Sequence, residues 1–398
     1  MSASLPPIPV AKPELDEEEA DAVRRVILSG WITQGPEVAA FETAFAAYVD
    51  APFATAVSNC TTALHLALKV VGVGRGDEVI TVSHSFIATA NAIRYCDATP
   101  VFVDIEADGF NIDPSRIEAA VTPRTKAILV VHQLGMPCDL AAVMAIAGPR
   151  SIPVIEDAAC ASGSEILRQG RWEKIGRPYG DIACFSFHPR KVITTGDGGM
   201  LTTANAEYDR KFRLWRQHSM SVADTVRHGS KSVIYETYPE LGYNYRMTDL
   251  QAALGRVQLR RLPGLVARRR RLADLYGRLI AAIAPAFTAP REPSWARTNW
   301  QSYCVRIPDG ADQRAIMQAL LDEGISTRRG VMNIAAEQAY AGQDTHRVAG
   351  GLERSMAAQE NSIILPLFAQ LSEEDVHRVV GALARVSTRM ERTLETAL

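Results

Sequence analysis

The sequence lacks any apolar run long enough to cross a membrane. No stretch approaches the ~20 uninterrupted apolar residues that a membrane-spanning helix needs. The N-terminal stretch MSASLPPIPVAKPELDEEE also lacks the basic start and the apolar core of a secretory signal. We therefore expect a cytoplasmic protein with no membrane partner.

Cysteine is sparse, and neither sign of charge is in large excess. The formal net charge of -2 gives no basic field of the kind that nucleic-acid-binding proteins use. No Cys-x-x-Cys pair is present, so the sequence predicts no metal site and no disulfide framework. We expect reduced thiols and no nucleic-acid partner. The six cysteines are Cys60, Cys96, Cys138, Cys160, Cys184 and Cys304.

The sequence does contain the material for a large folded core. Its 398 residues are 47% hydrophobic and 22% charged, which is ordinary for a globular protein long enough for two domains. We interpret its one dense basic run, Arg268–Arg271, as the solvated face of a helix rather than a phosphate-binding patch. The run lies among leucines at helical spacing: Leu265, Leu272, Leu275 and Leu279.

Helical and extended patterns alternate through the first part of the chain. Two helices open it, over DEEEADAVRRVIL, where Val23, Val26 and Ile27 share one face, and over PEVAAFETAFAAYV. Short apolar runs follow: FATAVSN, DEVITVS, TPVFVDI, KAILVVH, IPVIEDAA and DIACFSFH. Between them lie helix-like stretches such as TTALHLALKVV, ATANAIRYC and DLAAVMAIAG. This alternation predicts an α/β fold whose central sheet is mainly parallel and covered by helices on both faces.

The pattern changes past residue 260. We predict an N-terminal arm and a large domain over residues 1–258, then a linking helix and a smaller α/β domain over residues 259–398. The smaller domain has an alternating strand, QSYCVRI, and a helix, QRAIMQALLDEG. Its last helix begins with a capping box of Ser372 and Asp375. The expected buried stripe of that helix is Val376, Val379, Val380 and Leu383.

Polar residues follow several predicted strands, at the edge where an open parallel sheet binds ligands. Glu156 and Asp157 follow the run IPVI, where an acid either meets a positive partner or caps the next helix. Cys60, Thr61 and Thr62 open a helix after FATAVSN. Their amides and hydroxyls suit a phosphate, although a plain helix cap explains them as well.

Two further strand ends add a lysine and an aromatic ring. Ser186 and Lys191 follow the strand ACF, and the turn GDGG lets the backbone come close to whatever the lysine touches. Phe86 follows VITV and suits either stacking on a ring or simple packing. Together, the phosphate cradle, the acid, the aromatic ring and the enclosed lysine match what pyridoxal 5'-phosphate requires. We therefore expect this cofactor, with its pyridoxamine form arising during the reaction.

At these residues the chain resembles the DegT/DnrJ/StrS group of sugar aminotransferases, which share the aspartate aminotransferase type I fold. The similarity runs over nearly the whole length and implies a pyridoxal 5'-phosphate-dependent transferase with a large domain and a smaller C-terminal domain. The stretches that carry it are SGWITQGPEVAAFE, SNCTTALHLAL, SHSFIATANAI, VIEDAACASGS, FSFHPRKVITTGDGGM, LGYNYRMTDLQAALGRVQL and ILPLFAQLSEEDV.

The resemblance implies a role for each matching residue. Lys191 joins the cofactor's aldehyde and Asp157 pairs with its ring nitrogen, so these two are the expected catalytic residues. Phe86 stacks on the ring. The phosphate is held by Thr61, the amide of Cys60, and Ser186.

The resemblance also implies a homodimer, because two chains build each active site in this family. Asn244 would reach the phosphate of the neighbouring subunit's cofactor. The chain departs from the family at two positions. Cys160 stands where many members have a glutamine that contacts the cofactor's phenolic oxygen, and a thiol is a weak donor for that contact. Cys60 replaces a frequent glycine, and we expect its side chain to crowd the approach.

By resemblance, the reaction moves an amino group from L-glutamate to a keto group of a nucleotide-linked deoxysugar, by a ping-pong mechanism. A pyridoxal 5'-phosphate enzyme of the same fold acting on a cyclitol or aminoshikimate-type acceptor and a pyridoxal 5'-phosphate-dependent sugar dehydratase are the alternatives. Lys191 argues against the dehydratase, which has histidine there. A nicotinamide-dependent oxidoreductase would need GxGxxG after a first strand, which the sequence lacks. We interpret His188 as a structural hydrogen-bond partner and assign no role to Arg328 and Arg329.

Overall fold

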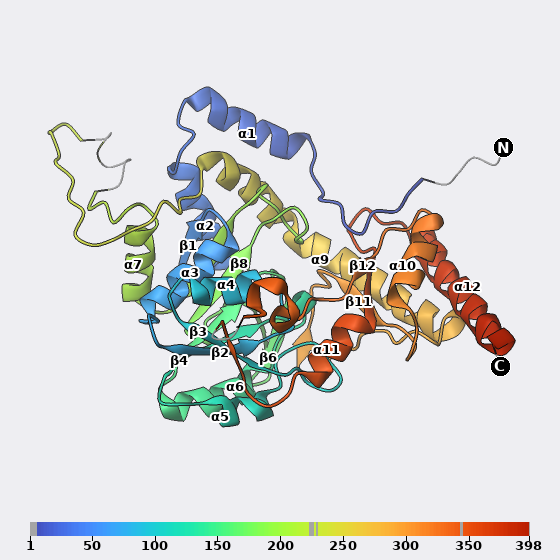
Figure 1. The fold of residues 1–398 in the computed structure, drawn as a ribbon. Helices are drawn as coiled ribbons and strands as arrows, with labels where there is room; N and C mark the ends of the chain where they lie inside the picture. Colours follow the sequence, from blue (N-terminus) through green and yellow to red (C-terminus); the bar gives the residue numbers. More distant parts are fainter. Residues whose placement is uncertain (1–5, 223–226, 228–229, 343–344, 398) are drawn as a thin grey trace.

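A large sheet of eight strands forms the centre of the molecule (Figure 1). The computed structural model describes residues 6–222, 227, 230–342 and 345–397, so the first five residues of the N-terminal arm lie outside the described part. All strands of the sheet run parallel except β9, which is antiparallel to both of its neighbours. In spatial order the strands are β1 (Phe53–Val57), β9 (Gly199–Thr203), β8 (Ile182–Ser186), β5 (Val154–Asp157), β4 (Thr125–Val131), β2 (Glu78–Val82), β3 (Thr99–Val103) and β13 (Arg347–Val348).

Helices cover both faces of this sheet because its strands are apolar on both faces. Side chains alternate along each strand, so Ile80 and Ile128 face one layer of helices while Val79 and Leu129 face the other. The predicted α/β class with a mainly parallel sheet is confirmed. One layer contains α2 (Pro36–Val49), α5 (Ile117–Ala120), α6 (Leu140–Ala147) and the start of α9 (Asp249–Ile283); the other contains α3 (Cys60–Val70), α4 (Ala88–Arg94) and α7 (Ala206–Trp215).

The long helix α9 links this layered part to a second core (Figure 1). That core is built on an antiparallel sheet of β11 (Tyr303–Arg306), β14 (Ser362–Leu365) and β12 (Arg328–Arg329). A third small sheet joins β10 (Ala296–Arg297), β6 (Glu165–Arg168) and β7 (Arg171–Lys174). The other α-helices in the described part of the chain are α1 (Glu17–Ser29), α10 (Gln313–Asp322), α11 (Glu353–Glu360) and α12 (Glu373–Ala397). The domain division at residue 258 falls inside α9 and stays a prediction.

The start of α12 has the predicted capping box. Ser372 Oγ accepts from the amide of Asp375, and Asp375 Oδ2 accepts from the amide of Ser372. All four residues of the expected stripe are fully buried: Val376, Val379, Val380 and Leu383.

The interpretation of Arg268–Arg271 as a solvated face is wrong for Arg269. Only 3% of this residue is exposed, and its guanidinium donates to the carbonyl oxygens of Trp300 and Leu367, each at 3.0 Å. Burial lowers the pKa of Arg269 to about 10. The arginine can be buried because backbone carbonyls at the junction of α9 with the second core accept hydrogen bonds from its guanidinium. Arg271 is exposed, as expected.

The predicted apolar face of α1 is also only partly correct. Val26 is buried, but 57% of Ile27 is exposed. The helix packs on α9 along a narrow stripe in which Ala22 and Val26 meet Ala253 and Val257. Ile27 lies outside this stripe. Among the described residues, no helix has both the length and the low polarity that crossing a membrane requires.

Candidate active site

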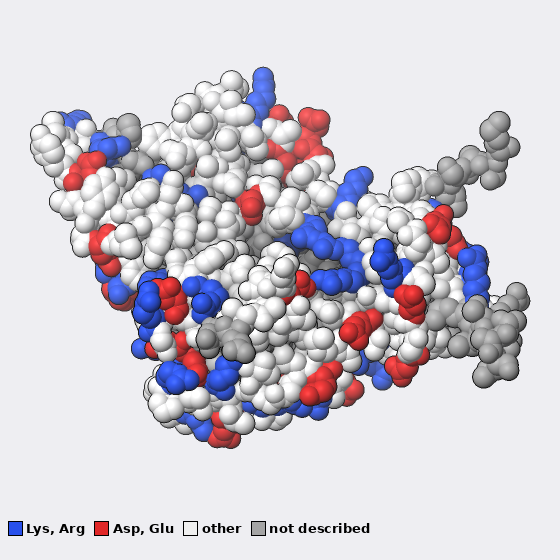
Figure 2. Space-filling view, in the orientation of Figure 1, with Lys and Arg blue, Asp and Glu red and all other residues white. Residues whose placement is uncertain are grey.

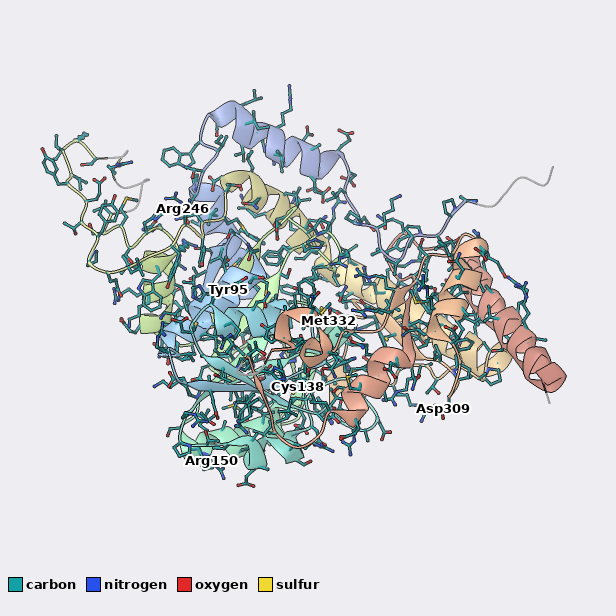
Figure 3. The ribbon with its side chains drawn as sticks, in the orientation of Figure 1. Tyr95, Cys138, Arg150, Arg246, Asp309 and Met332 are labelled. Atoms are coloured by element: carbon teal, nitrogen blue, oxygen red, sulfur yellow. The ribbon has the colours of Figure 1, made fainter. Side chains whose placement is uncertain are left out.

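A cavity of about 670 Å³ opens at the carboxyl ends of the parallel strands. Residues that follow β1, β2, β4, β5 and β8 line it from the large sheet, and residues 328–332 and 364–365 line it from the second core. Lys and Arg side chains gather beside this hollow (Figure 2). Tyr95, at the end of α4, and Met332, after β12, both line it (Figure 3). The cavity therefore lies where an open α/β sheet is expected to bind its ligand.

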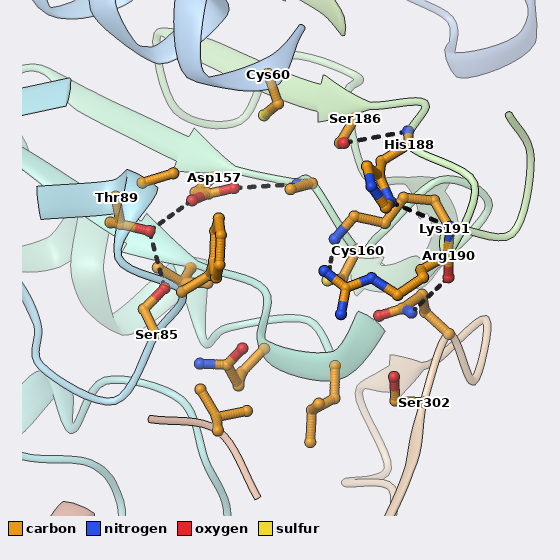
Figure 4. Close-up of a pocket in the computed structure, with 18 of the residues that line it drawn as sticks. Cys60, Ser85, Thr89, Asp157, Cys160, Ser186, His188, Arg190, Lys191 and Ser302 are labelled. Carbon is orange, nitrogen blue, oxygen red and sulfur yellow. Dashed lines mark hydrogen bonds between the residues drawn. The ribbon is translucent and has the colours of Figure 1, made fainter. Parts of the chain in front are cut away.

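Asp157, the last residue of β5, presents a buried carboxylate to this cavity (Figure 4). Its Oδ2 accepts from Thr89 Oγ1 at 2.8 Å and its Oδ1 accepts from the amide of Ala159 at 3.2 Å. Burial raises the pKa of Asp157, while these two hydrogen bonds and Lys191 lower it, and the balance lies above the usual value. Such a carboxylate is suited to a cationic partner inside the cavity.

Lys191 lines the cavity from the loop between β8 and β9. Its Nζ lies 3.1 Å from Cys160 Sγ (Figure 4), and its amide donates to His188 O at 2.8 Å. Burial by itself would lower the pKa of Lys191, but Cys160 and Asp157 raise it, and the pKa lies above the usual value. The loop is held by hydrogen bonds from Thr194 Oγ1 and the Thr195 amide to Phe187 O. The amine is thus presented from an ordered loop.

The first turn of α3 borders the same cavity. Asn59 caps the helix by accepting from the amide of Thr62 at 2.9 Å, and Cys60 and Thr61 line the cavity. Amides in a first helical turn have no carbonyl of their own helix to bond, so they suit an anion. The Cys60 thiol donates to Cys184 O at 3.6 Å, toward β8.

Seven of the eight predicted site residues line this one cavity: Cys60, Thr61, Phe86, Asp157, Cys160, Ser186 and Lys191. Phe86 is 60% exposed at its border. Asn244 is exposed and does not line the cavity of its own chain. The roles assigned to all eight stay predictions.

Several lining residues were not predicted to belong to the site. Thr89 was missed, although it lies only three positions after Phe86, in the first turn of α4. Arg190, Arg328 and Arg329 also line the cavity. His188, predicted to be structural, lines it too and accepts from the Arg190 amide at 3.2 Å. No His, Cys, Asp or Glu cluster suited to a metal ion occurs in the described ranges.

Comparisons with known proteins agree with one another. Residues 13–384 match the model of the DegT/DnrJ/EryC1/StrS aminotransferase family. The chain is 38% identical to the spore coat polysaccharide biosynthesis protein SpsC of Bacillus subtilis (92% of this chain, 94% of the relative). It is also 38% identical to the GDP-perosamine synthase of Caulobacter vibrioides (94% and 96%).

A solved structure is similar over almost the entire fold. The putative sugar aminotransferase Spr1654 from Streptococcus pneumoniae has been solved in a PMP form and a PLP form. The PMP form superposes with a TM-score of 0.88 at 29% identity, covering 96% of this chain and 99% of the other.

Proposed function

This chain belongs to the DegT/DnrJ/EryC1/StrS aminotransferase family, and from that premise we propose that it moves an amino group from L-glutamate to a keto group of a nucleotide-linked sugar. It is an aminotransferase, and its cofactor is pyridoxal 5'-phosphate, as in its structural relatives. The nucleotide-linked acceptor is supported by a relative that is named a GDP-perosamine synthase. The cytoplasmic location expected from the sequence stays a prediction.

The observation that carries the proposal is that Lys191 and Asp157 line the same cavity. The residues present fit the cofactor. The Asp157 carboxylate is buried and, among the described residues, receives hydrogen bonds from a hydroxyl and an amide alone, so it can take a protonated ring nitrogen as its cationic partner. Lys191 supplies the amine for the aldehyde. The phosphate would be held by the first turn of α3, at Cys60 and Thr61, and by Ser186.

Bound pyridoxal 5'-phosphate supplies an electron-withdrawing ring that weakens the Cα–H bond of the donor and carries the amino group between substrates. The protein's own residues perform the proton transfers. Asp157 would hold the proton on the ring nitrogen and so keep the ring electron-poor. Lys191 would move the proton from the donor's Cα to C4' of the cofactor, as general base and then general acid. Phe86 would cover the ring, and Cys160 lies beside the lysine amine. The second half-reaction repeats these transfers in reverse at the keto carbon of the acceptor.

We further propose that the active unit is a homodimer with shared sites. Asn244 is exposed and forms a β-bridge with Gln217 away from the cavity of its own chain. A second subunit placed against this surface would receive Asn244 at its own phosphate site.

The direct test is chemical. Borohydride should fix the cofactor to Lys191, as located by peptide mass spectrometry, and Lys191→Ala should be colourless and inactive. Nucleotide-linked ketosugars, supplied one at a time to the pyridoxamine-loaded enzyme, should restore the visible band of lysine-bound cofactor. A Lys191→Ala variant that still transfers nitrogen would overturn the catalytic assignment. Turnover of a cyclitol ketone but of no nucleotide-linked ketosugar would overturn the acceptor.

A further inference from the structure

The Lys191 amine has a thiol as its nearest hydrogen-bond partner. Cys160 Sγ lies 3.1 Å from Lys191 Nζ, within the range for a hydrogen bond to sulfur (Figure 4). We propose that Cys160 is a positioning residue for Lys191: its sulfur accepts a hydrogen bond from the lysine ammonium and holds the amine in the cavity whenever that amine is not joined to the cofactor. This inference rests on the role of Lys191 in the proposed function.

Hydrogen bonds from Asn299 hold the backbone around Cys160 in place. The buried side chain of Asn299 donates to Cys160 O at 2.8 Å and to Ser162 O at 2.9 Å. The backbone amide of Asn299 in turn donates to Ser164 Oγ at 3.0 Å. The thiol therefore projects toward the lysine from an anchored turn.

Cys160 is also chemically distinct from the other thiols. It is partly exposed and lines the cavity, whereas the remaining five cysteines are buried. A reagent that enters the cavity should therefore meet Cys160 first, and the four buried cysteines that do not line the cavity serve as internal controls in the same molecule.

The groups around Lys191 favour its charged, ammonium form. Burial by itself would lower the pKa of Lys191, and Cys160 opposes this more strongly than Asp157 or Cys60 does. A thiolate accepts a charge-assisted hydrogen bond from an ammonium, while a neutral thiol is a weak partner. The other charged or titratable groups that line the cavity are Cys60, Tyr95, Asp157, His188, Arg190, Asp197, Arg328 and Arg329.

The alkylation rate of Cys160 reports on its hydrogen bond with Lys191. In pyridoxamine-loaded enzyme the lysine is free, and iodoacetamide is the probe: the Cys160 thiolate attacks its methylene carbon and iodide leaves. Mass spectrometry gives the alkylation rate of Cys160 at a fixed, neutral pH. We expect Cys160 to react about tenfold faster in the wild type than in Lys191→Met, because a neighbouring cation stabilises a thiolate. Lys191→Arg, which keeps the cation, should restore most of this rate.

The control variant is Lys174→Met, which removes a lysine that does not line the cavity. It should leave the alkylation rate at the wild-type value. Equal rates in the wild type and Lys191→Met would overturn the inference, and so would an equal loss of rate in Lys174→Met, which would assign the effect to overall charge. Bound pyridoxamine 5'-phosphate, followed by its absorbance, shows that each variant is folded.

The reciprocal measurement follows the lysine. Acetylation of Lys191 by acetic anhydride in the pyridoxamine-loaded enzyme should have a lower pH midpoint in Cys160→Ala than in the wild type, and no change in the buried-thiol variant Cys304→Ala. An unchanged midpoint in Cys160→Ala contradicts the pairing. Neither readout depends on amino transfer, so failure of the acceptor assignment leaves these results standing, and an unchanged rate and midpoint in an enzyme that fixes its cofactor on Lys191 sink this inference alone.

Discussion

Thr89 donates its hydroxyl proton to Asp157, with 2.8 Å between Oγ1 and Oδ2. The two residues come from different elements, since Thr89 lies in α4, which follows β2, and Asp157 ends β5. Ser85 Oγ lies 2.8 Å from the same threonine oxygen. The orientation of the buried acid thus depends on a short hydroxyl chain that starts at the end of another strand.

Replacing Thr89 by valine should move the acid limb of the pH–activity profile to higher pH. The hydroxyl stabilises the ionised carboxylate, so its loss raises the pKa of Asp157, and the ionised form is the one that keeps the ring nitrogen protonated. We expect roughly tenfold lower kcat at neutral pH, equivalent to one charged hydrogen bond of about 1.5 kcal/mol. Thr89→Ser keeps the donor and should retain the wild-type profile. Coincident profiles for the valine and serine variants would refute this role.

Gly199→Ala should weaken cofactor binding although Lys191 itself is left in place. A Cβ at Gly199 would lie 2.5 Å from the backbone carbonyl oxygen of Asn59 and 2.8 Å from the amide of Cys60. The first turn of α3 must then shift, at a cost of about 1–3 kcal/mol. Titration of the variant with pyridoxal 5'-phosphate should show about tenfold or greater loss of affinity. Gly74→Ala, whose Cβ meets nothing within 4 Å, is the matched control and should bind normally.

Two inactive variants should restore each other if the sites are shared. Co-expressed Lys191→Ala and Asn244→Ala chains form mixed dimers in which one site has both residues intact. Random pairing makes half of the dimers mixed, so recovered activity should approach about a quarter of wild type in a symmetric dimer. Each variant is first measured alone, as the baseline. If Asn244 serves its own chain, the mixture will show only the sum of the two baselines.

Arg269→Met should destabilise the fold. The substitution leaves the carbonyls of Trp300 and Leu367 without their buried donor, and each charged hydrogen bond contributes about 1.5–3 kcal/mol. We expect the free energy of unfolding, measured with urea, to fall by about 2–4 kcal/mol. Arg271→Met, on the exposed side of the same helix, should change it by less than about 0.5 kcal/mol. Similar losses in the two variants would show that burial of Arg269 does not matter.

The strands that the sequence predicts correctly are those with continuous apolar runs, such as the one that ends at Asp157. Periodicity marks these strands because both of their faces are buried. The strand Gly199–Thr203 was not anticipated, since its sequence GMLTT begins with glycine and ends in two threonines, so it has no continuous apolar run. The pairing of Arg347–Val348 with β3 was not anticipated either, because two residues carry no periodic signal and their partner lies far away in the chain.

The residues of the candidate site could be predicted where a reactive side chain lies at, or soon after, the end of a strand. Lys191 and Asp157 lie just after β8 and at the end of β5, so topology alone brings them to one edge. Thr89 and Arg190 acquire their places from packing, which leaves no mark in local sequence. Arg269 was misassigned for a similar reason: the carbonyls that accept its hydrogen bonds belong to segments about 30 and 100 residues away.

The strand Arg347–Val348 returns the chain to the far edge of the large sheet, and the Arg347 guanidinium reaches Glu78 at 2.9 Å. The chain thus crosses between the two cores more than once. A protease cut in the stretch 284–302 would yield two fragments still held together by this returning strand and by the packing of α9 in the second core. The two pieces should therefore copurify, and their separate expression offers a route to reassembling the enzyme from halves.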